Sequence, residues 1–470
     1  MDNVVKLAKY LKELKYTDLP SATVENTKRL FLDMYGCMIA GSTADAVPEL
    51  VEMVNDWGGK EEATLFMYGN KVPALYAGLV NTVMSHARDF DDTHDPAVLH
   101  TSVVVIPACL AAAQVAEQKG IKVDGEDLIT AIVVGIDVHC KLSKSFTLSV
   151  PQSGFTYTAL CGYFAAATSA AKLLNLDEDG IINALGLVYT QAGGTNQAAM
   201  DAVLAKRCQP GFATMGGIIS AVMASKGITG VRNVFDGKNG FYHTYMKGNC
   251  KPEVFFDTLG KEFEVDALSY KPFPCCRFNH AAITLTKKMM TEHDIRPEEI
   301  IAVDIDTTAG TYRTICEPLE MRRNPDSPVC AQFSLPFTVS CQLGTGNVAL
   351  ENFTQEGIYD KRIRDIIGKV TPVVNEELEA KYGRGCGAVR ITVKTTRGEF
   401  TDFGEEAKGS PTNPMSLEDI EEKVRSCTKF SALPVDDAAL SEAIRAIEAL
   451  ENEQSTENLM CVLNRPFVKV

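Results

Sequence analysis

The chain has 470 residues, of which 45% are hydrophobic and 23% are charged. This composition is typical of globular proteins and excludes disordered, collagenous and coiled-coil ones. The formal net charge of −15 repels nucleic acid and anionic membrane surfaces, so we expect neither as a partner. A small anionic substrate would need a local cluster of Lys and Arg side chains. At about 150 residues per domain, the length predicts two or three domains.

No stretch of the sequence reaches the ~18 apolar residues that a membrane-spanning helix needs. The longest apolar run, 103–115, contains Pro107. The N-terminus is predicted to be an amphipathic helix without a signal peptide's apolar core or cleavage site, so we expect a cytoplasmic protein. The fourteen cysteines include no C-x-x-C pair. This argues against a zinc site, an iron–sulfur cluster or a disulfide framework.

Residues 1–263 are predicted to form one helix after another. Pro48 begins a helix that Gly58 ends. Further apolar helices are predicted at 103–119, 128–139, 162–174 and 212–225. Helices that are apolar on most faces belong in the centre of a large helical domain.

The pattern changes near residue 264. Ile301, Val303 and Ile305 alternate with Ala302, Asp304 and Asp306, which predicts a strand. The same alternation at 389–393, followed by a turn at 395–398, predicts a hairpin. Helices are predicted at 281–292 and 361–368. Residues 264–408 are therefore predicted to form an α+β domain.

The Gly- and Pro-rich run 409–414 marks a second boundary. Ser416 and Asp419 then form a capping box at the start of a new helical region. A helical tail after a mixed insert predicts that the chain returns to its first domain. The predicted fold class is mainly α: a large helical domain from 1–263 and 409–470, with the α+β domain of 264–408 inserted.

The strongest candidate for chemistry is the segment 86–102, HARDFDDTHDPAVLHTS, with three of the seven histidines and four aspartates. One interpretation is an acid–base site, because crowded carboxylates and imidazoles shift one another's pKa values. A second is a divalent-cation site built from carboxylate oxygens. A third is a polar loop between helices in which Asp residues act as caps.

Three basic segments are candidates for binding an anion. Lys206 and Arg207 stand at the start of a predicted helix, where a plain solvated pair is the alternative. The segment 269–280, SYKPFPCCRFNH, presents Lys271, Arg277 and His280 just ahead of another helix, where positive groups suit a carboxylate. Its alternative is a linker stiffened by proline. Arg322 and Arg323 are predicted to be a surface run.

Together these segments resemble the MmgE/PrpD family, which includes 2-methylcitrate dehydratases, cis-aconitate decarboxylases and iminodisuccinate epimerases. The resemblance rests on motifs in order along nearly the whole chain: HARDFDDTHD, CGYFAAATSAAKLLNLDEDGIINALG, AKRCQPGFAT, YKPFPCCRFNHAA, CEPLEMRRNPDSPVCAQFSLPF and GSPTNPMSLEDIEEK. It implies a helical domain with an inserted α+β lid. It also implies a homodimer that works without metal or organic cofactor.

Carried over by motif, the family's active-site positions fall at Asp89, Thr93, His100, Lys206 and Lys271, between the helical domain and the lid. The resemblance implies small di- or tricarboxylate substrates. Lys206 and Lys271 would hold carboxylates and stabilise an enolate-like state. The acid–base pair would be Asp89 and His100.

Other groups complete this expected site. Arg88, Arg277 and His280 are additional candidates for substrate binding, whereas Asp91 and Asp92 are expected to shape or cap the loop. The sequence departs from the family pattern at Thr156, Gln209 and Cys276, where members often have His. These missing imidazoles argue against cis-aconitate decarboxylation, and Arg88 replaces a usual Leu.

The first functional hypothesis is a cofactor-free lyase that eliminates water from a hydroxylated polycarboxylate of the 2-methylcitrate type. The alternatives are an epimerase or isomerase of a dicarboxylate such as iminodisuccinate, and a cis-aconitate-type decarboxylase. Two further hypotheses are a carboxylate-binding dimer without activity and a metal-dependent hydratase using DFDDTHD. The substrate and stereochemistry are not readable from the residues.

Overall fold

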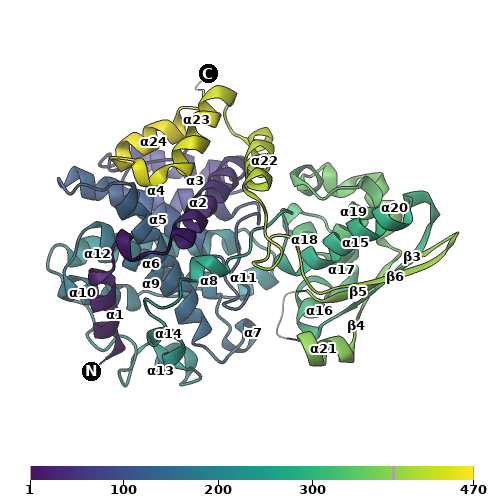
Figure 1. Cartoon of the computed structure of the whole chain (residues 1–470), viewed down its shortest axis with the longest axis horizontal. Helices are drawn as coiled ribbons and strands as arrows, with labels where there is room; N and C mark the ends of the chain where they lie inside the picture. The colour runs from purple at the N-terminus through teal and green to yellow at the C-terminus, as the bar shows by residue number, and fades with distance from the viewer. Residues whose placement is uncertain (1, 384–386, 469–470) are drawn as a thin grey trace. The chain divides into compact units, whose positions relative to one another are not determined.

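The computed structural model describes residues 2–383 and 387–468, and it confirms the predicted mainly α fold (Figure 1). The chain forms two compact units. Unit 1 takes the described residues of Met1–Ala87, Asp91–Leu268 and Leu417–Val470, and unit 2 takes those of Arg88–Phe90 and Ser269–Ser416. Within 2–383 and 387–468, no helix has the length and apolar character needed to cross a membrane.

In its described residues, unit 1 consists of helices and loops with one two-stranded ladder, β1 (Ala63–Thr64) and β2 (Lys71–Val72). Its longer helices are α1 (Asn3–Glu13), α2 (Ser21–Gly41), α3 (Val47–Trp57), α4 (Ala74–His86), α5 (Ser102–Gln118), α6 (Gly125–Lys144), α9 (Gly162–Leu173), α10 (Glu178–Tyr189), α12 (Ala205–Ala224), α22 (Leu417–Cys427), α23 (Asp437–Glu448) and α24 (Thr456–Asn464). The short ones are α7 (Val150–Ser153), α8 (Tyr157–Leu160), α11 (Gln197–Met200), α13 (Phe241–Met246) and α14 (Pro252–Phe256).

The centre of unit 1 is the packing of α12 against α4, α5 and α9. Almost every residue of α5 is buried, as its apolar sequence predicts. Small residues let these helices approach closely: a Cβ at Gly217 of α12 would lie 2.3 Å from the Cβ of Ala166 on α9. This close-packed base carries the ends of α4 and α5, between which the Asp-rich segment runs.

The C-terminal helices return to unit 1, where α22 packs against α2 (Figure 1, yellow-green beside dark purple) and α24 packs against α5. A buried ion pair fixes the first contact, with Lys423 Nζ 2.6 Å from Asp33 Oδ1. Because a buried charge without its partner is costly, this pair ties the last segment to the second helix of the chain.

Unit 2 contains a four-stranded sheet in the order β4-β3-β5-β6. Its strands are β3 (Ile300–Thr307), β4 (Val370–Val374), β5 (Val389–Thr395) and β6 (Gly398–Gly404). Its helices are α15 (His280–His293), α16 (Ala309–Ile315), α17 (Leu319–Arg323), α18 (Pro328–Gln332), α19 (Leu335–Thr345), α20 (Lys361–Ile367) and α21 (Glu376–Tyr382). β3 pairs in parallel with β4 and antiparallel with β5, and α15 and α19 pack against this sheet.

The predicted hairpin is β5–β6, paired from Val389 opposite Gly404 to Thr395 opposite Gly398. The alternation predicted for Ile301, Val303 and Ile305 is wrong at Ile301. The register shifts between Ile300 and Ala302, so Ile300 is buried and Ile301 is 59% exposed.

The units divide the chain at 268/269 and 416/417, whereas the sequence placed the boundaries near 264 and 409. Residues 264–267 form a short 3-10 helix, η2 (Glu264–Ala267), that belongs to unit 1. The assignment of Arg88–Phe90 to unit 2 was not predicted, because three residues inside a helical region carry no compositional signal.

Candidate active site

In unit 1, one carboxylate oxygen orients two histidines. His86 is the last residue of α4 and His100 precedes α5. Asp91 Oδ2 lies 3.0 Å from His86 Nδ1 and 2.7 Å from His100 Nδ1, and the two rings are 4.8 Å apart. The His100 side chain is 19% exposed, while those of His86 and Asp91 are buried. His100 is therefore the imidazole of this cluster that a ligand can reach.

Lys206, at the start of α12, fixes the tautomer of His86. Its Nζ lies 3.0 Å from His86 Nε2. An ammonium only donates, so His86 accepts at Nε2 and donates from Nδ1 to Asp91. Burial lowers the pKa of His86 to about 4 against the opposing effect of Asp91, and the Lys206 charge adds to the lowering. His86 is thus neutral at pH 7.

Asp91 was expected to shape or cap the loop, and the structure brings its carboxylate next to two imidazoles that could do chemistry. Burial alone would raise the pKa of Asp91, but His86 and His100 outweigh it and hold the pKa well below its usual value. Asp92 does cap: it accepts hydrogen bonds from the Ser102 N–H at 3.3 Å and from the Ser102 hydroxyl at the start of α5. Burial raises the pKa of Asp92 to about 6.

Another buried histidine, which was not predicted from the sequence, holds the backbone around His100. The His100 N–H donates to Thr158 Oγ1 at 3.0 Å. His139 on α6 lies 3.0 Å from Thr101 Oγ1 and 3.1 Å from the Thr158 carbonyl. Burial lowers the pKa of His139 to about 3, so it is neutral. Its sequence signal was a lone His within an apolar helix, which is also typical of a structural residue.

Thr93, another predicted site residue, is buried and donates a hydrogen bond to Asp95 Oδ1 at 2.9 Å. In this structure its hydroxyl shapes the turn of the Asp-rich segment. Arg207, which follows Lys206, is not a solvated neighbour as its alternative suggested. It is 8% exposed and donates to the Asp45 carbonyl at 3.0 Å.

In unit 2, Lys271 pairs with Asp89. The fully buried Lys271 Nζ donates to the Asp89 carbonyl at 2.9 Å and to Asp89 Oδ2 at 3.0 Å. Asp89 has a left-handed backbone with φ of 51°, a conformation that Asp and Asn tolerate better than most residues. The Arg88 carbonyl accepts from Gln332 Nε2 at 2.7 Å. Two side chains of unit 2 therefore hold residues 88 and 89.

Arg277 and His280 lie in the same unit, in η3 (Arg277–Asn279) and at the start of α15. Arg277 Nη1 donates to the Lys408 carbonyl at 3.3 Å. His280 Nε2 lies 3.1 Å from the Cys275 carbonyl, and burial with the nearby Arg277 and Lys271 charges lowers its pKa well below the usual value. A neutral, buried His280 suits a structural role better than the predicted contact with substrate.

The three positions that depart from the family pattern hold no titratable imidazole. Gln209 Oε1 accepts from the Thr195 N–H at 2.5 Å, and its Nε2 donates to the Thr195 carbonyl at 3.1 Å. Thr156 is the N-cap residue of α8. Cys276 is buried, and burial raises the pKa of its neighbour Cys275 well above the usual value. The Gln209 amide thus forms hydrogen bonds with the backbone of Thr195.

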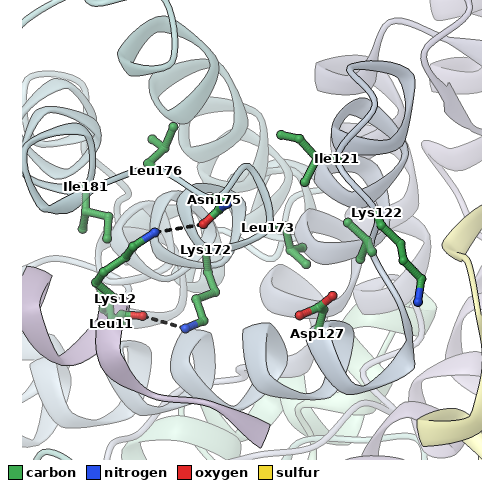
Figure 2. A pocket seen from close by; sticks show the side chains of 11 residues that line it. Leu11, Lys12, Ile121, Lys122, Asp127, Lys172, Leu173, Asn175, Leu176 and Ile181 are labelled. Carbon is green, nitrogen blue, oxygen red and sulfur yellow. Dashed lines mark hydrogen bonds between the residues drawn. The ribbon is translucent and has the colours of Figure 1, made fainter.

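A cavity of about 230 Å³ lies elsewhere in unit 1, between the ends of α1 and α9 (Figure 2). Lys172 Nζ donates to the Leu11 and Leu14 carbonyls at 2.8 and 2.5 Å, and Lys12 Nζ to Asn175 Oδ1 at 2.9 Å. Carbonyls at a helix C-terminus favour such cations. Lys172 at this cavity therefore has a structural explanation.

The two units define a class: a helical protein with an inserted α+β unit, carrying an imidazole–carboxylate cluster and a lysine–carboxylate pair. The MmgE/PrpD N-terminal domain model matches residues 5–253, and the MmgE/PrpD C-terminal domain model matches 273–449. The chain belongs to the MmgE/PrpD family.

Named relatives are similar over most of their length. A cis-aconitate decarboxylase-like protein, oryM, from Aspergillus oryzae is 27% identical, over 98% of this chain and 96% of the relative. A cis-aconitate decarboxylase from Aspergillus terreus is 25% identical with the same coverage. The human cis-aconitate decarboxylase is 26% identical, over 88% of this chain and 85% of the relative.

Proposed function

We propose that this protein is a lyase that eliminates water from a small hydroxylated polycarboxylate of the 2-methylcitrate type, with its own side chains as acid and base. The observation that carries the proposal is the chain of contacts Lys206–His86–Asp91–His100. A partly exposed imidazole on a buried, ionised carboxylate is suited to moving a proton at neutral pH.

In the proposed reaction, His100 removes the proton next to a substrate carboxylate. Asp91 stabilises the imidazolium that results, because its carboxylate oxygen lies 2.7 Å from the other ring nitrogen. The C–H and C–O bonds break, the C=C bond forms and water leaves once the hydroxyl is protonated. The His100 imidazolium returns the proton it took to this hydroxyl, since the Asp89 carboxylate is engaged in an ion pair with Lys271. Lys206 and Lys271 stabilise negative charge on the substrate.

Decarboxylation is the second candidate, because the relatives above are named cis-aconitate decarboxylases. Dehydration is preferred because this chain has Thr156, Gln209 and Cys276 where the family resemblance expects imidazoles. The Gln209 amide is tied to Thr195 and cannot titrate. An epimerase shares the first proton removal and remains the third candidate.

The test is a panel of citrate, 2-methylcitrate, cis-aconitate and iminodisuccinate with the purified chain. Dehydration gives a new alkene absorbance without gas. Carbon dioxide release from cis-aconitate indicates decarboxylation. Recovered iminodisuccinate that is inverted and deuterated in heavy water indicates epimerisation. Either of these two results without dehydration overturns the first proposal, and His100→Gln controls for contaminating activity.

A further inference from the structure

A buried set of charges holds the segment of unit 1 that leads into unit 2. The Glu264 side chain, in η2, is 3% exposed. Lys144 Nζ on α6 lies 2.8 and 3.1 Å from its two oxygens, and His94 Nε2 lies 2.9 Å from Oε2. Burial disfavours the carboxylate, but His94 and Lys144 outweigh it and lower the pKa of Glu264 to about 2. Glu264 is therefore a charged anchor.

The backbone of the same segment is held from α6 as well. Asp137 Oδ1 accepts from the Glu264 N–H at 2.8 Å. The fully buried Lys141 Nζ lies 2.9 Å from Asp137 Oδ2 and donates to the Glu262 carbonyl at 2.5 Å. Side chains of α6 thus fix both the main chain and the carboxylate of this segment. The contact with His94 reaches the Asp-rich segment.

The position of the His94–Glu264 contact in the chain indicates a role beyond stability. The chain returns to unit 1 at Asp91 and leaves it again after Leu268. His94 is the fourth residue after the return, and Glu264 is the fifth from the last before the departure. The His94–Glu264 contact therefore joins, within unit 1, two of the segments that connect it to unit 2. One of them carries Asp91, three residues from His94.

We propose that Glu264 is a positioning residue, which acts through His94 to hold the Asp91 carboxylate in place for His100. The catalytic part of this inference rests on the proposed function. A purely structural ion pair would make Glu264 and Lys144 equivalent, since each would lose the same charge contact. A positioning role makes them different, because only Glu264 contacts His94.

The experiment compares Glu264→Gln with Lys144→Gln, using the panel acid that the wild-type chain turns over. Glu264→Gln should lower kcat about tenfold or more with KM little changed, because small displacements of a catalytic group are costly. Lys144→Gln keeps the His94 contact and should keep kcat within about twofold. Equal losses in both variants, or no loss in either, overturn the proposal.

Hydrogen exchange gives a readout that needs no substrate. Glu264→Gln should accelerate amide exchange in 91–97 as well as in 262–268, whereas Lys144→Gln should accelerate at most the second segment. Acceleration confined to 262–268 in both variants overturns the inference. If Glu264→Gln does not fold, His94→Gln tests the same contact from its other end, with the same expected exchange in both segments. A wild-type chain inactive on the whole panel counts against the proposed function, while the exchange comparison still decides this inference.

Discussion

Each unit contains a lysine beside a possible catalytic group, but the two lysines have different partners. In unit 1, Lys206 donates to His86, which burial keeps neutral. In unit 2, the fully buried Lys271 faces the carboxylate of Asp89. In the first arrangement the lysine contacts a neutral imidazole, so the pair keeps a net positive charge. The second is an ion pair, in which each charge depends on the other for its burial.

The largest expected effect tests the role of His100 of unit 1 in proton transfer. His100→Gln keeps the size and polarity of the side chain but removes the base. We expect kcat to fall by about a thousandfold, within the usual range for losing a general acid–base group. Because His100 is partly exposed, the melting temperature should change little. Steady-state kinetics with thermal melts check this, and a fully active variant would move the base elsewhere.

The next effect tests the ion pair between Lys271 and Asp89 in unit 2. Lys271→Met leaves the buried Asp89 carboxylate without its ammonium, which should cost about 3–5 kcal/mol of unfolding free energy. The double variant Lys271→Met with Asp89→Asn removes both charges and should recover much of that loss. Asn also tolerates the left-handed backbone at this position. Urea unfolding measures both, and equal stability of the single and double variants would show that the pair is not coupled.

The sequence predicted the elements of the fold better than it predicted the roles in the site. Hydrophobic periodicity and turn residues are local, so α3, α15 and the β5–β6 hairpin were predicted within one or two residues. The roles of Asp91 and Asp92 depend on which atoms face them, and adjacent aspartates look alike in a sequence. Their separation into an imidazole partner and a helix cap needed coordinates.

Buried polar groups were the hardest to predict. Arg322 was expected on the surface but is 8% exposed, because its guanidinium donates to the carbonyls of Thr314 and Glu317. The buried Glu264 falls at the predicted boundary, where nothing in the local sequence indicates burial. A charged residue becomes buried only when distant groups satisfy it, and those partners are not visible in the local pattern.

A smaller effect concerns pH, because burial in unit 1 keeps His86 and His139 neutral. The pKa of His139 falls from 6.5 to about 3 on folding, mainly through burial. The unfolded chain therefore binds more protons below pH 6.5. The stability contributed by neutral His139 is present above that pH and is lost as the pH falls toward 3. This loss should amount to about 2 kcal/mol between pH 6.5 and 5.

The variant His139→Gln isolates this contribution, since an amide can also bond to Thr101 and Thr158 but does not titrate. Its unfolding free energy should fall less steeply than that of the wild type between pH 6.5 and 5. Urea unfolding at several pH values measures the two slopes. Identical slopes would mean that other groups dominate the acid sensitivity.

The smallest expected effect sharpens the contrast between the lysines. Lys206→Ala removes a charge whose partner, His86, is neutral, so stability should change by less than about 1 kcal/mol. If Lys206 also holds a substrate carboxylate, KM should rise about tenfold, the usual value of one charge-assisted hydrogen bond. The exposed Lys226, just beyond α12, provides the control variant Lys226→Ala with unchanged kinetics.

Because the Lys206 charge lowers the pKa of His86, that pKa should rise in Lys206→Ala, as measured by NMR titration. A higher pKa of His86 with an unchanged KM would limit Lys206 to tuning the imidazole, and its role in substrate binding would be withdrawn.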